Sequence, residues 1–168
     1  MTMTAPERIL AARTLLQDIT PLKTDCGRRC GAACCKPDAD GQGGMLLFPG
    51  EEALYDPAPD WATITESPIV IEGKPLLFLT CDGHCPREER PLACRIFPLT
   101  PALKDGKPIV QLDIRAWPLC PLMPHGVSGL SRDFVAAAQA GAALLCEEAT
   151  ARAYIAWLTD TLADYGRL

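Results

Sequence analysis

Histidine is scarce in this sequence, and the motifs of several common enzyme classes are missing. The 168 residues include two histidines, His84 and His125. A cysteine hydrolase needs a histidine base beside its thiol, and the adjacent side chains of His84 and Cys85 cannot easily take up that geometry. We therefore interpret both histidines as loop residues. The sequence also lacks a glycine-rich phosphate loop, a dinucleotide-binding fingerprint and an HExxH zinc motif.

Long apolar runs and strong positive charge are lacking as well. No stretch approaches the roughly 18 apolar residues of a membrane span. The N-terminus has no charged start followed by an apolar run, as a secretory signal would. We therefore expect a cytoplasmic protein without a membrane partner. The net charge of −5 argues against a general nucleic-acid binder, whose footprint is a basic patch or stripe.

Cysteine, in contrast, is abundant and clustered. Nine cysteines occur in the chain, and four of them fall within the ten residues from Cys26 to Cys35. Thiolates are soft donors, and zinc and iron–sulfur clusters each take about four of them. Without an export signal, these thiols are expected to be reduced and metal-bound, and their odd number excludes complete disulfide pairing within one chain.

Eight of the cysteines are candidate metal ligands. On a helical path Cys26, Cys30 and Cys34 recur every four residues and share one face. The whole candidate set is Cys26, Cys30, Cys34, Cys35, Cys81, Cys85, Cys94 and Cys120. Eight thiols could serve two four-thiolate sites, or one principal site with spare thiols. We favour one principal site, because the adjacent side chains of Cys34 and Cys35 diverge in most backbone conformations. The leading ligand set is Cys26, Cys30, one of Cys34 and Cys35, Cys81, Cys85 and Cys94.

Cys146 and Cys94 are expected to differ in role. Cys146 follows Leu144 and Leu145 on an alanine-rich helix, where a small hydrophobic thiol packs well, so we do not count it as a ligand. Cys94 lies between Pro91 and Pro98 in a segment rich in turn residues. We expect this segment to offer little apolar burial, and ligation is then the better reason for a thiol there.

The charged residues near the cysteines are expected to support a site rather than form one. Basic residues surround the thiols, and we expect them to compensate the negative charge of thiolates: Arg28, Arg29, Lys36, Arg87, Arg90 and Arg95. Arg90 and Arg95 are expected to hydrogen-bond carbonyl groups. Glu88 and Asp113 are interpreted as solvated charges.

The thiols and the motifs around them resemble the CxxCxxCC family, described as zinc- or iron-chelating domains. Three segments carry the resemblance, which covers residues 22 to 121: Cys26 to Cys35, Leu47-Phe48-Pro49-Gly50-Glu51, and Cys81…Cys85 with Arg90-Pro91…Cys94-Arg95…Phe97-Pro98. The spacing departs from the family name, with three residues between Cys26 and Cys30 and three between Cys30 and Cys34. Either member of the Cys34–Cys35 pair can then be the ligand. The resemblance implies a bound metal.

The order of predicted elements favours an α+β fold. Residues 4 to 19 predict a helix with a Thr4–Glu7 capping box and an apolar stripe formed by Ile9, Leu10, Ala12, Leu16 and Ile19. A loop over 36–44 and a short strand over 45–48 follow. A short helix is predicted within 49–55. Two hairpins are expected, one with strands at 69–71 and 76–79 and one over 99–114 that turns at Asp105-Gly106. The strand over 76–79 runs directly into Cys81, which would aim Cys81 and Cys85 at the first cysteine cluster.

The remaining elements are helical. A short helix over 87–95 would carry Cys94, and two longer helices over 131–147 and 150–164 would be capped by Ser131 and Thr150. We expect one domain, 1–168, with a cysteine-rich part over 22–121 and a helical cover over 131–165. It would be a small loop-rich fold with short β-hairpins around a cysteine metal site, flanked by N-terminal and C-terminal helices.

Two functions are compatible with these features. The first is a metal-binding module in which zinc or an iron–sulfur cluster, held by thiolates, stabilises the fold and presents a surface to a protein partner. The second is an iron–sulfur redox or protein-modifying enzyme, because some relatives in the resembled family carry the motif beside a protein lysine methylation activity. Thiolates suit both metals, so the sequence leaves the metal and the presence of catalysis open.

Overall fold

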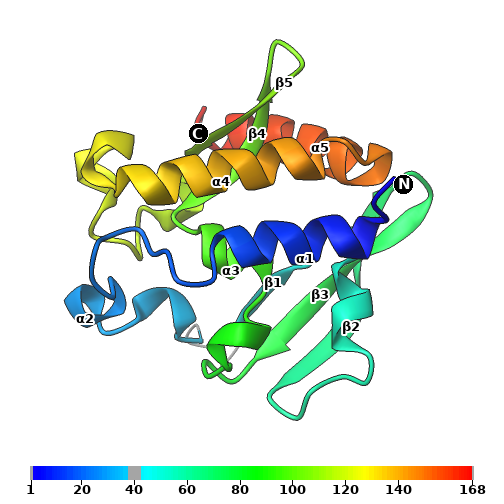
Figure 1. Cartoon of the computed structure of the whole chain (residues 1–168), viewed down its shortest axis with the longest axis horizontal. Helices are drawn as coiled ribbons and strands as arrows, with labels where there is room; N and C mark the ends of the chain where they lie inside the picture. Colours follow the sequence, from blue (N-terminus) through cyan, green and yellow to red (C-terminus); the bar gives the residue numbers. More distant parts are fainter. Residues whose placement is uncertain (1, 38–42, 168) are drawn as a thin grey trace.

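Helix α1 (Ala5–Leu15) opens the chain and lies beside the C-terminal helices (Figure 1). The computed structural model describes residues 2–37 and 43–167, so residues 38–42 of the predicted loop lie outside the described part. The backbone N–H of Thr4 donates to the Glu7 carboxylate over 2.7 Å, as the predicted capping box requires. The helix ends at Leu15, earlier than predicted, and Leu10 is 52% exposed instead of joining the apolar stripe.

A three-stranded antiparallel sheet follows, with strand order β1-β3-β2. Its strands are β1 (Gly44–Leu46), β2 (Ala62–Ile71) and β3 (Lys74–Cys81). The hairpin between β2 and β3 turns at Glu72-Gly73, and β2 begins seven residues before the predicted strand. Pairing between β2 and β3 is interrupted between Glu66 and Val70 by a β-bulge. Strand β3 ends at Cys81, so the sheet delivers a thiol to its edge, as predicted.

A second, two-stranded sheet is the predicted hairpin of β4 (Leu99–Lys104) and β5 (Lys107–Leu112). Asp105 and Gly106 form its turn, both with positive φ. The predicted helix over 87–95 is split, because Pro91 separates a 3-10 turn at Arg87–Glu89 from α3 (Leu92–Ile96). Proline lacks the N–H that a continuous helix would use there.

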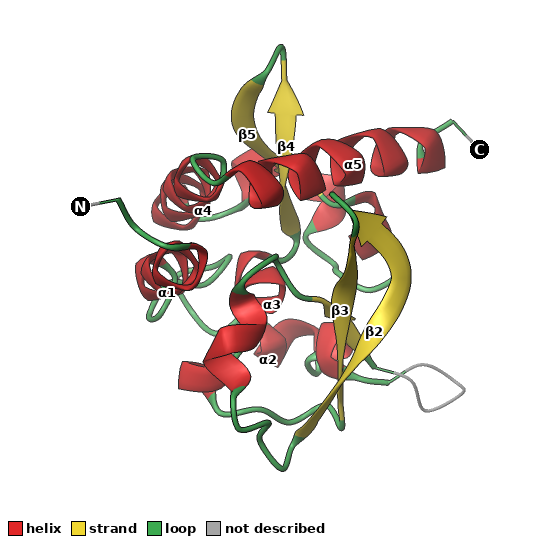
Figure 2. Cartoon of the chain, turned by 90° about the vertical axis from the view of Figure 1, so that its right-hand side faces the viewer, coloured by secondary structure: helices red, strands yellow, loops and turns green. Residues whose placement is uncertain are grey.

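Helices α4 (Arg132–Leu145) and α5 (Ala149–Tyr165) close the chain near the predicted positions. The cap of α5 differs from the prediction: the Glu148 carboxylate, not Thr150, accepts from the Ala151 N–H over 2.7 Å. Figure 2 shows α1 and α4 side by side, with the β1–β3–β2 sheet apart from them. The main apolar core lies where α1, α3, α4 and α5 meet, and Phe134 and Ile155 are fully buried in it.

The structure is therefore a small α+β fold with five helices and two small antiparallel sheets within the described residues. Short pieces connect these elements: α2 (Gly27–Cys30) and 3-10 turns such as Ala33–Cys35 and Glu51–Tyr55. No helix in the described part of the chain is long and apolar enough to cross a membrane.

Candidate metal centre

Segments far apart in the sequence bring the candidate thiols to one end of the molecule. Cys26 and Cys30 bracket α2, and the chain then reverses through Gly31 and Ala32, both left-handed, into the turn that carries Cys34 and Cys35. A left-handed conformation is strained for alanine. It persists here because the reversal folds Cys34 and Cys35 back beside α2.

The loop after β3 approaches this reversal closely. Gly83 has φ +90°, and a Cβ built on it would lie 2.7 Å from the carbonyl oxygen of Cys35. Only glycine fits a contact this close. The loop between Cys81 and Cys85 therefore lies directly against the Cys34–Cys35 turn, as expected from a strand that runs into Cys81.

One set of neighbouring thiols surrounds Cys94 on α3, and we call Cys35, Cys81, Cys85 and Cys94 the Cys94 group. Burial is the largest influence on Cys94 and raises the pKa of its thiol, and negative charge on Cys35, Cys85 and Cys81 raises it further. Four thiols from three segments are therefore close enough to share charge. These four candidate ligands are therefore neighbours in the structure.

Cys34 and Cys35 interact with each other. A hydrogen bond from the Cys34 thiol is the main influence that holds the pKa of Cys35 below its usual value, and the positive charges of Arg90 and His84 act in the same direction. The same hydrogen bond raises the pKa of Cys34, which keeps the shared proton. Cys35 is thus the more readily formed thiolate of the pair. Thiolate is the form that binds metal.

The remaining candidates form a second set, the Cys120 group of Cys26, Cys30 and Cys120. Burial raises the pKa of Cys26, and the charges of Asp25, Cys30 and Cys120 raise it further. Burial and the charge of Cys30 likewise raise the pKa of Cys120. Cys26 and Cys120 both pack against the main core. Cys34 is a neighbour of both groups, because charges on Cys94 and Cys26 both act on it.

The cysteines are all free thiols. Within residues 2–37 and 43–167, no three histidine, cysteine, aspartate or glutamate side chains converge as closely as the ligands of one metal ion do. The two groups are thus sets of neighbouring thiols, and their side chains would have to turn toward a common ion to ligate it.

Arginine side chains surround the Cys94 group. Arg90 hydrogen-bonds Cys85. Burial lowers the pKa of the Arg90 guanidinium. The hydrogen bond and the nearby charges of Cys85, Cys35 and Cys94 outweigh burial, so the pKa is raised overall. Arg95 is buried and donates to the carbonyl oxygens of Arg90 and Arg87 over 2.7 and 2.6 Å. The expected carbonyl contacts are therefore present for Arg95.

Arg95 carries its charge without an ion pair. Burial, and then the neighbouring charges of Arg13 and Arg87, lower the pKa of its guanidinium to about 10. Among the described residues, no carboxylate lies within 4.0 Å of Arg13, Arg87, Arg90 or Arg95. Glu51 is buried near this cluster but bonds backbone N–H groups of Phe48 and Leu92. Within this cluster, Arg90 is the arginine whose guanidinium contacts a thiol, that of Cys85.

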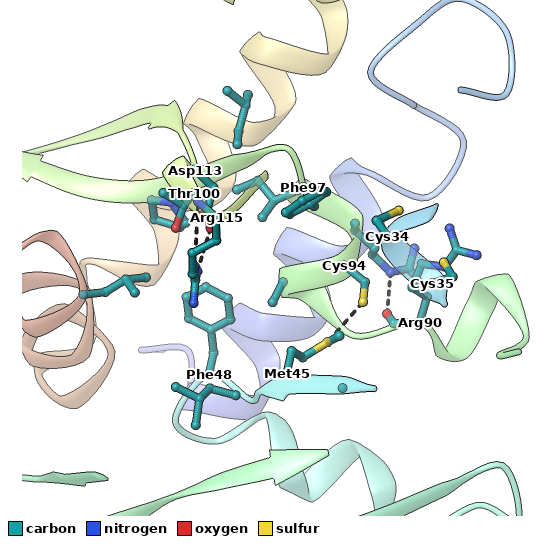
Figure 3. Close-up of a pocket in the computed structure, with 18 of the residues that line it drawn as sticks. Cys34, Cys35, Met45, Phe48, Arg90, Cys94, Phe97, Thr100, Asp113 and Arg115 are labelled. Atoms are coloured by element: carbon teal, nitrogen blue, oxygen red, sulfur yellow. Dashed lines mark hydrogen bonds and ion pairs between the residues drawn. The ribbon is translucent and has the colours of Figure 1, made fainter. Parts of the chain in front are cut away.

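Met45 is a sulfur neighbour that the sequence analysis missed. Its thioether lies 3.1 Å from the Cys94 thiol, which donates to it (Figure 3). Thioethers are soft donors as well. The alternation of side chains along β1 could have shown which face of the strand Met45 occupies. The contact between Met45 and Cys94, however, depends on the packing of α3 against β1, which the sequence does not show.

Two expectations about burial and charge were wrong. Cys94 is largely desolvated, because its thiol faces a cavity lined mainly by apolar residues. Asp113 is only 3% exposed and pairs with Arg115, with 2.6 Å between its Oδ2 and Nη2. The partner is only two residues further along the chain, but the sequence does not show that the fold buries the carboxylate. His84, His125 and Glu88 are exposed as expected, and Cys146 is buried in the main core.

Comparisons with models of known protein families, with curated proteins and with solved structures find no match for this chain. The candidate site therefore has to be interpreted from its own residues.

Proposed function

We propose that this chain binds zinc or an iron–sulfur cluster through cysteine thiolates, with Cys35, Cys81, Cys85 and Cys94 as the principal ligands. The donors fit either group, since both take about four thiolates. The metal would tie together three segments that otherwise share few buried side chains. Its role would first be structural, as in small domains whose folding is coupled to metal binding.

The observation that carries this proposal is the pairing of clustered thiols with a cation that has no carboxylate partner. A four-thiolate zinc site has a net charge of about −2, because four thiolates surround one divalent ion. A charge withdrawn from water is costly unless it is paired and hydrogen-bonded. Arg90 is half-buried, hydrogen-bonds Cys85 and has no carboxylate within 4.0 Å among the described residues. A negative metal centre would balance its charge, as the compensation expected from the sequence requires.

The division of thiols also supports a particular use of the Cys34–Cys35 pair. Cys35 is the readier thiolate and belongs to the Cys94 group, whereas Cys34 keeps the proton and also neighbours Cys26. We assign Cys35 to the principal site. The Cys120 group and Cys34 are then spare thiols beside it, which could hold a second ion.

The test compares two cysteine-to-serine variants that differ only in position. Cys94→Ser should lose most of the bound metal, because serine is a poor ligand for the metals that thiolates prefer. Cys146→Ser, the matched control, should keep the metal and lose only about 1–2 kcal/mol of stability, from burying a hydroxyl. Metal content per folded protein, measured after purification without oxygen or chelator, distinguishes them.

If Cys94→Ser is insoluble, Cys85→Ser provides the same test from the half-exposed loop. Cys120→Ser should keep most of the metal if the principal site is the Cys94 group. Loss of metal from Cys120→Ser and Cys146→Ser, with retention in Cys94→Ser and Cys85→Ser, would reverse the assignment. Visible absorption separates the two metals, since a zinc protein is colourless and an iron–sulfur cluster absorbs.

A further inference from the structure

A cavity of about 720 Å³ separates the three-stranded sheet from α3, α5 and the base of the β4–β5 hairpin. Protein interiors are close-packed, and voids larger than a water molecule are few. Most of its walls are aliphatic or aromatic, formed by residues such as Leu16, Leu46, Phe48, Phe97, Leu99 and Leu158. Apolar walls favour the transfer of an apolar molecule out of water. The walls therefore suit the apolar body of a small organic ligand.

The β-bulge of strand β2 forms one side of this cavity. Residues 65–69 line it, and the register shift between Glu66 and Val70 removes Ser67 to Ile69 from pairing with β3. Bulges commonly re-aim side chains beside binding sites. Here the bulge turns Ile69 toward the cavity and leaves Val70, the next residue, 59% exposed.

The two ends of the cavity differ in chemistry (Figure 3). The thiols of Cys34, Cys35 and Cys94 lie at one end, together with Met45. Thr100, Asp113 and Arg115 lie at the other. Tyr154 also lines the cavity, and the charge of Arg115 acts on its hydroxyl, so Tyr154 belongs to the Arg115 end.

The Arg115 end offers hydrogen-bond donors that have no acceptor. Thr100 and Tyr154 are each 3% exposed, and within residues 2–37 and 43–167 neither side-chain hydroxyl donates a hydrogen bond. Arg115 uses Nε and Nη2 to hold Asp113, over 2.9 and 2.6 Å, which leaves Nη1 for another acceptor. Both hydroxyls can be reached from the cavity, and the Arg115 side chain is 50% exposed. A ligand with an acceptor oxygen at this end would satisfy them.

The charge at this end selects the kind of acceptor. Asp113 already neutralises Arg115, because the two form a bidentate ion pair with the carboxylate buried. A ligand carboxylate would add a second negative charge next to the Asp113 carboxylate, and like charges this close repel each other. An uncharged carbonyl oxygen accepts from the same donors without that cost.

We propose that this cavity binds an apolar organic molecule that ends in an uncharged carbonyl group. The carbonyl oxygen accepts from Thr100, Tyr154 and Arg115, and the apolar chain extends toward Cys94 and Met45. Cys35 and Cys94, which we propose as metal ligands, line one end of this cavity, whereas Thr100, Tyr154, Arg115 and Ile69 lie apart from the proposed ligands. The experiments below change only this second set, so their outcome is separate from the metal content.

The first experiment tests the polar end with the full-length protein and a defined probe, N-methyldecanamide, by isothermal titration calorimetry. We expect it to bind, and decanoate to bind at least about tenfold more weakly because of its charge. Thr100→Val and Tyr154→Phe each remove one donor and should weaken amide binding about fivefold. Thr63→Val, the same change on an exposed β2 residue outside the cavity, should leave binding unchanged.

The second experiment tests the apolar walls and does not depend on the donors. Ile69→Trp should fill part of the cavity and abolish amide binding, whereas Val70→Trp on the exposed neighbour should not. Equal binding by Ile69→Trp and Val70→Trp would overturn the proposal, and so would tighter binding of decanoate than of the amide. Absence of amide binding to the folded wild-type protein would also overturn it.

Discussion

The helical side of this molecule and its thiol end are held together in different ways. Helix α4 alone buries six residues, among them Phe134, Ala138 and Ala142. Three short elements that carry or flank thiols, α2, Ala33–Cys35 and Arg87–Glu89, bury none, whereas α3, which carries Cys94, buries Leu92 and Ile96. The helical side is therefore stabilised by apolar packing, which the segments around Cys26–Cys35 and Arg87–Glu89 largely lack.

The contacts that hold the thiol end together are mainly polar. Arg95 and Arg87 bind carbonyl groups of neighbouring turns, and the thiols lie against Arg90. Such contacts hold loops in place, and a hydrogen bond from a charged donor contributes about 1.5–3 kcal/mol in net terms. The comparison suggests that a thiol-bound metal supplies the stability here that apolar burial supplies on the helical side. The experiments below are ordered by the size of the effect that we expect.

The largest effect should come from the helical side. Phe134 is fully buried in the main core, and Phe134→Ala should lower the free energy of unfolding by about 3–5 kcal/mol through lost packing and a cavity. The metal content of the folded fraction should not change. Tyr165→Ala, on the exposed end of α5, serves as the control and should cost about 0.5 kcal/mol or less. Urea unfolding measures both.

Removal of the metal should produce the next largest loss of stability, and this loss should occur at the thiol end. A bound metal at one hundred times its dissociation constant stabilises the folded state by about 2.7 kcal/mol. Chelation should therefore lower the thermal midpoint and allow proteases to cut within residues 22–121 before they cut α4 or α5. An apo protein with the same midpoint and the same cleavage pattern would show that the thiol end is stable without metal.

Two glycine variants sharpen the same comparison. Gly73→Ala and Gly83→Ala both place a side chain at positive φ, +79° and +90°, at a cost of about 1–2 kcal/mol each. Gly73 has nothing within 4 Å, whereas at Gly83 the new methyl group would meet the Cys35 carbonyl. Only Gly83→Ala should therefore also reduce metal content. Metal analysis of the two purified variants tests this, and equal metal content would argue against a site between these loops.

The smallest effect concerns Glu51, whose carboxylate joins the two regions by accepting from the Leu92 N–H at the start of α3. Burial raises the pKa of this carboxyl above its ordinary value, although its hydrogen bonds oppose the shift. The folded state therefore holds the proton more tightly than the unfolded chain. Its contribution to stability is complete below the unfolded pKa and is lost as pH rises through the folded pKa.

Glu51→Gln removes this titration. The stability of the wild-type protein relative to the variant should fall as the pH rises above the ordinary carboxyl pKa of about 4.3. Urea unfolding at a series of pH values measures the difference. A relative stability that rises with pH would mean that the Arg13 and Arg95 charges outweigh burial at Glu51.

Local signals in the sequence predicted much of the fold. The Thr4–Glu7 cap, the Asp105-Gly106 turn and the two C-terminal helices depend on residues close in sequence, and all are present. The extent of β2, the exposure of Leu10 and the burial of Asp113 were not predicted. Each depends on which distant element packs against the residue, and periodicity carries no such information.

Only part of the candidate site was predicted, because its other features also depend on packing between distant elements. Clustering identified the thiols, and the end of β3 at Cys81 explained how one pair reaches the others. The division into the Cys94 and Cys120 groups depends on the reversal at Gly31 and Ala32 and on the position of α3. Met45 and the cavity arise from packing between β1, α3 and α5, which no single segment reveals.

Metal analysis of wild-type protein purified without oxygen or chelator tests the central claim most directly. We expect at least one equivalent of zinc, or iron with matching sulfide, per folded chain, because a site of four thiolates binds its metal tightly. Reconstitution of a stripped sample should restore the same content. Less than about half an equivalent of any transition metal in a folded sample, before and after reconstitution, would contradict the claim.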